Sequence, residues 1–270
     1  MSAPVITFLS DYGLEDDFVG VCHGVIAKIC PEVRVIDITH GVARHDVRAG
    51  AIILRGALPY MPVGVHLAVV DPDVGAERRA IALRAADERI FVGPDNGLLS
   101  LAAAAAGGVV EVADIGRSHF RLQPVSATFH GRDVFAPVAA RLAVGAPLAA
   151  AGDPRDPDRL VTLELPAPRR ENGALLAQAV YVDRFGNVQL NAGHDELAGV
   201  GLRLGHRVEL EVGSGGRYQA VYVRTFADVA EHELLVYEDA YRRLAVAVSR
   251  GNAAKRLGLT ADDELWIRPA

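Results

Sequence analysis

The chain has 270 residues, of which 50% are hydrophobic and 23% are charged, a composition typical of globular proteins. Its formal net charge of −6 opposes broad attraction to nucleic acid or anionic lipid. No apolar run reaches the roughly 18 residues that a membrane helix needs, and no basic segment precedes the first apolar stretch. We therefore expect a soluble cytoplasmic protein with neither nucleic acid nor membrane as a partner.

The first half of the chain alternates β-branched runs with helical patterns. Strands are predicted at residues 5–10, 33–39, 63–70 and 109–114, and helices at 16–30 and 46–58. Strict alternation of strand and helix favours parallel strands with helices on both faces. We predict a mostly parallel, Rossmann-like α/β sandwich over residues 1–160.

The second half has a different pattern. Proline and charged residues concentrate between Gly152 and Gly173, which predicts a linker over 161–173. Seven short strands with turn signals between them follow, at 175–183, 187–191, 207–212, 218–225, 233–239, 243–249 and 264–269. Residues 174–270 are therefore predicted to form a smaller antiparallel β-barrel domain.

The cysteine and histidine patterns give no sign of a disulfide or a metal site. Cys22 and Cys30 are the only cysteines, and in one helix they would be separated by about 12 Å of rise, too far for a disulfide. Two buried, reduced thiols are expected. The nine histidines show no HxH or HExxH spacing and no CxxC is present, so no metal is expected.

Acidic residues follow three predicted strands: Asp11, Asp37 with the nearby His40, and Asp71. Any one of them alone fits the common role of a turn former. In an open parallel sheet, however, ligands bind outside the carboxyl ends of the strands. Three such acids at one edge favour a polar pocket there.

The sequence VDPDVGAERR places Arg78 where a tight turn returns it toward Asp71. Spacing alone fits a structural ion pair as well as a catalytic one. Farther along, TFHGRDVFAP places His130 beside Gly131 at the start of a helix, where the backbone can approach a ligand closely. A structural role for this lone histidine is the alternative.

Six segments in order, SDYG, VDPDVGAERR, GPDNGLL, TFHGRDVFAP, DRFGNVQLN and TFADV, resemble the S-adenosylmethionine hydroxide adenosyltransferases. This family is related to the fluorinases and chlorinases, and the resemblance covers roughly residues 5–265. It implies hydrolysis of S-adenosylmethionine (SAM) to adenosine and methionine, without a cofactor, by a homotrimer with active sites at its subunit interfaces.

The resemblance also implies roles for individual residues. Asp71, Arg78 and His130 would hold the attacking water, with Asp71 also touching the substrate. The halogenases carry Tyr at the position of Asp71, which places this chain among the hydrolases. Asp11 would accept hydrogen bonds from the ribose hydroxyls.

The substrate-binding residues implied for the second domain are Asp183, Asn187 and Phe226. The first two would grip the adenine edge and the methionine end. Phe226 would pack beside the substrate, where a π-face suits a sulfonium. Without the resemblance, these positions fit a hairpin turn and a core aromatic residue.

The sequence departs from the family pattern at two places. Asp73 stands where a Gly is usual, and it either raises the pKa of Asp71 or points outward. Asp239, Ala240 and Arg242 replace the usual Asn, Ser and Gly, so Glu238 or Asp239 is expected to meet the methionine ammonium. A SAM-dependent 5′-halogenase and a non-catalytic adenosine or SAM sensor are the alternative functions.

Overall fold

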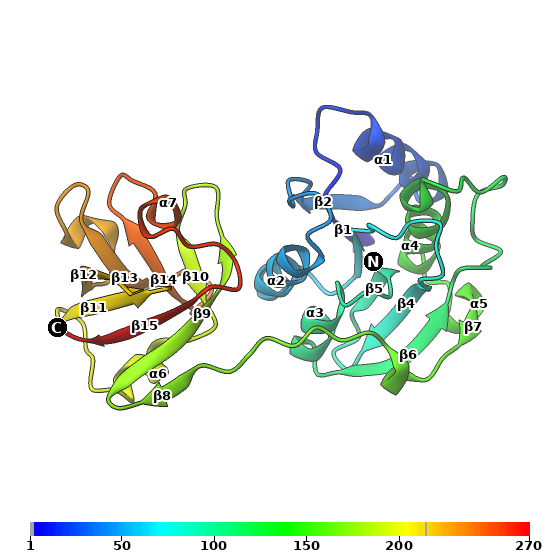
Figure 1. The fold of residues 1–270 in the computed structure, drawn as a ribbon. Coiled ribbons are helices and arrows are strands. Elements are labelled where there is room, and N and C mark those ends of the chain that lie inside the picture. The colour runs from blue at the N-terminus through cyan, green and yellow to red at the C-terminus, as the bar shows by residue number, and fades with distance from the viewer. Residues whose placement is uncertain (1–2, 214) are drawn as a thin grey trace. The chain divides into compact units, whose positions relative to one another are not determined.

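The structure is a computed structural model that describes residues 3–213 and 215–270. The chain divides into two compact units, Met1–Leu163 and Glu164–Ala270 (Figure 1). Among the described residues, no helix is both long and apolar enough to cross a membrane.

Unit 1 is a seven-stranded sheet with helices packed on it. Its main elements are β1 (Val5–Ser10), α1 (Phe18–Ile29), β2 (Arg34–Thr39), α2 (Val47–Ala57), β3 (Val65–Val69), β4 (Ala80–Ala85), β5 (Ile90–Pro94), α3 (Ser100–Ala105), β6 (Val109–Asp114), α4 (Ala136–Ala143), α5 (Leu148–Ala151) and β7 (Asp153–Pro154). Short helices are η1 (Leu58–Tyr60), the π-helical η2 (Gly131–Phe135) and η3 (Pro157–Arg159).

The strand order in unit 1 is β2-β1-β3-β5-β4-β6-β7. The pairs β2–β1, β1–β3 and β3–β5 are parallel, whereas β4, β6 and β7 pair antiparallel. β1 and β3 end in register, with Ser10 opposite Val69, so Asp11 and Asp71 leave the same edge of the sheet. The parallel half of the sheet thus delivers the predicted acids to one edge.

Unit 1 has a continuous apolar core between its sheet and helices. β1 and β3 are buried almost throughout, and α1 contributes Val19, Cys22 and Ile26 to the same core as α4. The prediction of two buried free thiols is confirmed for Cys22 and Cys30, the latter at the carboxyl cap of α1.

Unit 2 is a closed β-barrel. Its elements are β8 (Arg169–Glu171), β9 (Ala174–Val182), β10 (Val188–Leu190), α6 (His194–Ala198), β11 (Arg207–Val212), β12 (Gly216–Tyr222), η4 (Phe226–Asp228), β13 (Leu234–Glu238), β14 (Leu244–Val248), α7 (Ala253–Leu257) and β15 (Glu264–Pro269). The order is β10-β14-β13-β12-β11-β15-β9-β8, and pairing of β10 with β9 closes a ring of seven strands.

The predicted fold class is confirmed: an α/β unit is followed by a β-barrel. All seven strands predicted for residues 174–270 are present. The structure adds β8, which lies within the expected linker, and a single parallel pair, β12–β13, in the otherwise antiparallel barrel. It also adds three strands of unit 1 that were not predicted: β4, which directly follows Arg78 and Arg79, β5 and the short β7.

Candidate active site

Asp71, Arg78 and His130 lie together at the sheet edge of unit 1. Arg78 Nε donates to Asp71 Oδ1 over 2.8 Å, and Arg78 Nη2 pairs with the second carboxylate oxygen. Nη2 also lies 2.9 Å from His130 Nδ1. The Asp71 and Arg78 side chains are only 6% and 9% exposed, and the guanidinium lies over the Phe135 ring. The three residues form one connected, largely dry network.

The tight turn between Asp71 and Arg78 depends on Gly75. This glycine has a φ of +83°, and a Cβ there would lie 2.6 Å from the carbonyl oxygen of Ala127. The turn is therefore packed against the backbone just before His130, and only glycine meets both conditions. Asp73, in the same turn, is exposed.

The segment GPDNGLL holds the turn at both of its ends. Asn96 Nδ2 donates to the carbonyl of Val70, directly before Asp71, over 2.9 Å. Buried Asp95 accepts from Arg79 Nε, directly after Arg78, over 2.9 Å. These contacts with the loop that follows β5 fix the positions of the catalytic candidates, a role that sequence analysis missed.

The partner of His130 determines which form of the imidazole is present. A guanidinium has only donors, so Nδ1 must accept and the proton of the neutral ring sits on Nε2. Burial, together with the charge of Arg78, lowers the pKa of His130 below its ordinary value. At neutral pH the ring is therefore neutral and offers Nε2–H as a donor.

Tyr12 is a further member of this region that the sequence analysis did not single out. Its hydroxyl lies where a Cβ on Gly131 would be, 2.1 Å from the ideal position, so Gly131 gives it room beside His130. Burial is the main cause that raises the pKa of Tyr12 well above its ordinary value. The phenol thus remains a neutral hydrogen-bond donor.

Asp11 follows β1 at the same edge and is partly exposed. Its Oδ2 accepts from the backbone N of His45 over 2.9 Å. This contact ties the first-strand acid to the loop before α2. The structure therefore brings Asp71, Arg78 and His130 into direct contact and places Asp11 on the same sheet edge, without a hydrogen bond to them among the described contacts.

The other predicted site residues lie in unit 2 around a cavity of about 840 Å³. Asp183, Asn187 and Phe226 line this barrel cavity, whereas Glu238 does not. Glu238 instead pairs with Arg242 over 2.7 Å. The cavity also has lining residues that were not predicted to bind substrate: Tyr181, Phe185, Gln189, Tyr237, Tyr241 and Arg250.

Asp183 and Asn187 form a self-contained turn. Asp183 Oδ1 accepts from the backbone N of Phe185 and of Asn187, and its Oδ2 accepts from Asn187 Nδ2 over 2.8 Å. This arrangement orients the Asn187 amide and leaves its carbonyl oxygen as an acceptor for a ligand.

Asp239, at the end of β13, is the acid that lines the barrel cavity where the family pattern departs. Its Oδ1 accepts from the backbone N of Tyr241 and of Arg243, and Gln189 Nε2 donates to its Oδ2. Of the two acids expected to meet a methionine ammonium, Asp239 is therefore the one on the cavity.

Phe226 and Tyr237 form the aromatic part of this cavity wall, with ring centroids 4.9 Å apart. Burial, with added influence from Asp183 and Asp239, raises the pKa of Tyr237 to about 12. A neutral aromatic pair of this kind can pack on a purine or face a sulfonium.

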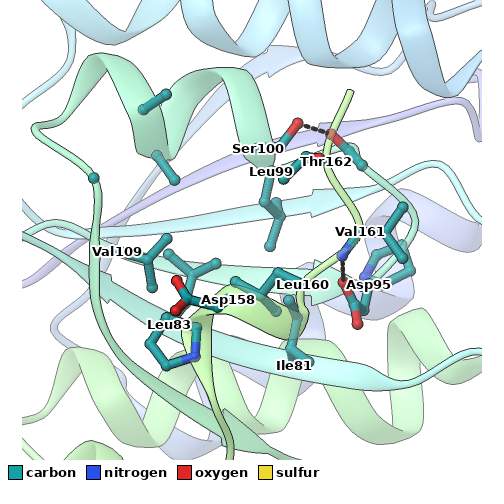
Figure 2. A pocket seen from close by; sticks show the side chains of 16 residues that line it. Ile81, Leu83, Asp95, Leu99, Ser100, Val109, Asp158, Leu160, Val161 and Thr162 are labelled. Carbon is teal, nitrogen blue, oxygen red and sulfur yellow. Dashed lines mark hydrogen bonds between the residues drawn. The ribbon is translucent and has the colours of Figure 1, made fainter. Parts of the chain in front are cut away.

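A second cavity in unit 1, of about 240 Å³, is lined mainly by apolar side chains from β4, α3 and residues 157–162 (Figure 2). Its polar groups serve the chain itself: Asp95 accepts from Val161 N, and Ser100 Oγ accepts from Leu163 N. We interpret it as a structural cavity where residues 157–162, which lead to unit 2, pack against β4 and α3.

The sequence matches two family models, the SAM hydroxide adenosyltransferase N-terminal domain over residues 6–152 and the C-terminal domain over 177–266. The chain belongs to this family. The (R)-S-adenosyl-L-methionine hydrolase of Salinispora tropica is 53% identical to it over 264 residues, covering 98% of this chain and 97% of the relative.

Less similar proteins extend the comparison. A fluorinase from an Actinoplanes species is 28% identical, covering 90% of each chain. The crystal structure of an uncharacterized conserved protein from Thermotoga maritima is 37% identical with a TM-score of 0.91, covering 97% of this chain and 99% of that one. The family predicted from the sequence is confirmed, and the hydrolase relative is far more similar than the fluorinase.

Proposed function

We propose that this protein hydrolyses SAM to adenosine and methionine, with a preference for the (R) configuration at the sulfonium. The observation that carries the proposal is the contact of Asp71, Arg78 and His130 at the ligand edge of the parallel half of the sheet. The family and the name of the relative at 53% identity support the substrate and its configuration.

The reaction needs a nucleophile more than it needs an acid. Methionine leaves as a neutral thioether, so nothing has to protonate it. Water attacks C5′ of the ribose, the C5′–O bond forms as the C5′–S bond breaks, and one proton is released. The enzyme must therefore hold water in line with the breaking bond and accept hydrogen bonds from it.

The network around Arg78 suits this task. His130 donates from Nε2 to the water oxygen, so the two hydrogens of the water point away from the imidazole. The carboxylate of Asp71 accepts one of those hydrogens through a lone pair that Arg78 does not use. Arg78 keeps the carboxylate fixed and supplies positive potential that favours hydroxide character as the water loses its proton.

Low exposure of the network favours the reaction in a second way. A hydroxide-like nucleophile and a sulfonium neutralise each other as the new bond forms, so removing water from the site favours the transition state. The 6% and 9% exposure of Asp71 and Arg78 meets this requirement. No cofactor takes part in the proposed chemistry.

Substrate recognition is divided between two sets of residues. Asp11 accepts hydrogen bonds from the ribose hydroxyls. The side-chain carbonyl of Asn187 accepts from the adenine amino group, and Asp183 holds the Asn187 side chain in place. Phe226 packs against the substrate. Asp239, rather than the neighbouring Glu238, takes the methionine ammonium.

We extend the proposal to a homotrimer in which unit 1 of one subunit and unit 2 of its neighbour together bind SAM. The family resemblance supports it, as does the separation of the two residue sets into two units. We also place the protein in the cytoplasm, because its two buried cysteines are free thiols, as expected in a reducing compartment.

The first test is to incubate the purified protein with a mixture of both sulfonium epimers of SAM and follow adenosine and methionine by chromatography. We expect equimolar release from the (R) form and loss of release in Asp71→Asn, which keeps the side-chain shape. Release of a 5′-halo-adenosine in the presence of halide would support the halogenase instead. Tight adenosine binding without methionine release would support the sensor.

The trimer is tested by mixing Asp71→Asn with the double variant Asn187→Ala/Phe226→Ala at a SAM concentration far below KM, where both parents should have little activity. Each variant keeps intact the set of site residues that is altered in the other. If sites are shared between subunits, co-refolding equal amounts should restore about a quarter of the wild-type activity, because one interface in four then pairs two intact halves. If every site lies within a single chain, mixing restores nothing.

A further inference from the structure

A cluster of two histidines and one aspartate lies beside the sheet edge of unit 1, apart from the Asp71–Arg78–His130 network. It consists of His23 from α1, Asp37 from β2 and His40 just after β2. Figure 1 labels α1 and β2. One potential ligand atom from each residue lies within 4.8 Å of the other two. We propose that this cluster binds a divalent transition metal, zinc foremost, and we argue it independently of the proposed function.

The distances between the donor atoms fit a metal site. His23 Nε2 and His40 Nε2 lie 2.9 and 3.1 Å from the same oxygen, Asp37 Oδ1. In a tetrahedral zinc site with bonds of about 2.0–2.1 Å, neighbouring ligand atoms are about 3.3 Å apart. The ligand atoms of the two histidines lie within 4.8 Å of each other, so the rings would approach by no more than about 1.5 Å to admit the ion.

His40 supplies the observation that separates a metal site from an ordinary ion pair. Its side chain is 2% exposed, and its buried Nε2 makes no hydrogen bond among the described residues. Although Asp37 Oδ1 is 3.1 Å away, the pair does not satisfy hydrogen-bond geometry. This buried nitrogen therefore has one poorly aligned contact with a carboxylate, and a metal bond would satisfy it better.

The surroundings orient His40 as a ligand. Its Nδ1 lies 2.8 Å from Ser10 Oγ, and when Nδ1 donates there, the lone pair of Nε2 faces Asp37. Metal-binding histidines are commonly fixed in this way through their second nitrogen. The Phe8 ring packs edge-on against His40, with centroids 4.6 Å apart, and limits its rotation.

The other two ligands leave the site open to a small ion. The side chains of His23 and Asp37 are 35% and 41% exposed, so a metal can enter from solvent and water can complete its coordination. Two imidazoles with one carboxylate match the preferences of zinc and of its neighbours cobalt and nickel, whereas magnesium and calcium prefer oxygen ligands.

A bound ion would stiffen the edge that carries Asp11. Ser10 also accepts from the backbone N of Tyr12, and the carbonyl of His40 accepts from Gly13 N over 2.8 Å. The metal would thus join α1 and β2 to residues 10–13. Its expected role is structural support of this segment.

The test is titration of the untagged full-length protein, first freed of metal with a chelator, with zinc chloride in a calorimeter. We expect one equivalent of saturable binding and a rise in Tm of about 5 °C or more at saturation. Cobalt should give the intense visible absorption of a tetrahedral centre. This band reports coordination directly and does not depend on enzyme activity.

The matched variants are His23→Ala and Asp37→Asn, each of which removes one partly exposed ligand, with the exposed His119→Ala as control. The first two should weaken zinc binding at least about tenfold and lose the cobalt band, whereas the control keeps both. Equal metal-free Tm values would verify that the variants fold. Absence of saturable binding in the wild type, or unchanged affinity in His23→Ala, would overturn the proposal.

Discussion

The aspartates of the two units are held in different ways. In unit 1, Asp71 is bound by the side chain of Arg78, which also reaches His130, 52 positions along the chain from it. In unit 2, Asp183 and Asp239 accept from backbone N–H groups two and four positions farther along their own turns. The first arrangement joins side chains from distant segments, whereas the second depends mainly on local structure, although Gln189 also donates to Asp239 from 50 positions away.

This difference separates two kinds of function. A buried network of opposite charges can respond to charge that develops during a reaction, so it suits chemistry. Carboxylates satisfied by their own turns fix the shape of a cavity, so they suit recognition. We therefore expect substitutions in unit 1 to act mainly on kcat and those around the barrel cavity mainly on KM.

The largest effect is expected from Arg78→Met. It leaves Asp71 buried without its partner, which should lower the free energy of unfolding by about 3–5 kcal/mol. It also removes the donor to His130, so kcat should fall by at least about 10²-fold. Thermal unfolding and steady-state kinetics on the same preparation measure both effects.

Arg79→Met is the matched control for that variant. Arg79 pairs with Asp95, whose side chain is 2% exposed, so its loss also leaves a buried carboxylate without its arginine. It should destabilise the protein but lower kcat much less than Arg78→Met in the molecules that remain folded, because Arg79 helps only to position the turn. Equal losses of kcat in both variants would mean that Arg78 acts only through stability.

A smaller effect is expected from Gly131→Ala. The new methyl group would occupy the position of the Tyr12 hydroxyl, 2.1 Å away, and Tyr12 is held in a cluster with Phe8, Phe18 and Phe129. Such overpacking costs about 1–3 kcal/mol. Tyr12→Phe removes the clashing oxygen, so the double variant should regain part of the stability. A double-mutant cycle measured by denaturant unfolding tests this contact. If the two changes in the free energy of unfolding simply added, the contact would be contradicted.

The sequence predicts the barrel strands better than it predicts the sheet of unit 1. Each barrel strand is a short run between local turn signals, and all seven were predicted. β4 was missed because it begins directly after the charged turn, and its pairing with β5 and β6 depends on contacts distant in sequence. The fold class followed from periodicity, which local sequence carries.

The same limit applies to the candidate site. Asp71, Arg78 and His130 were predicted from strand ends and family resemblance, and they do meet in the structure. The role of Asn96 was not predicted, because its target is a backbone carbonyl 26 positions earlier. The candidate metal cluster was recognised only in part: Asp37 and His40 were singled out as residues at a strand end, whereas His23 lies on α1 and meets Asp37 only in the folded chain.

In the barrel, Asn187→Ala should raise KM by about tenfold and leave kcat within about twofold, since one hydrogen bond contributes about 0.5–1.5 kcal/mol. Gln219→Ala, which removes an exposed amide that does not line the cavity, serves as the control. Initial rates over a range of SAM concentrations separate the two constants. A large fall in kcat at unchanged KM would instead place Asn187 in the chemistry.

The smallest effect near neutral pH is expected from the protonation of His130, which should make both stability and activity depend on pH. Burial and Arg78 lower its pKa from the ordinary 6.5, so the neutral ring persists at and above that pH. As pH falls below 6.5, the unfolded chain binds the proton first, so the contribution of this group to stability declines. Activity declines later, as the pH passes through the lowered pKa, because a protonated Nδ1 cannot accept from Arg78.

The measurement is the dependence of kcat/KM on pH. Because a single group titrates, kcat/KM should fall by no more than about tenfold per pH unit on the acid side. Because a glutamine carbonyl can still accept from Arg78, His130→Gln should retain some activity and lose the acid limb. A limb centred above 6.5, or one that survives in His130→Gln, would assign the titration to another residue.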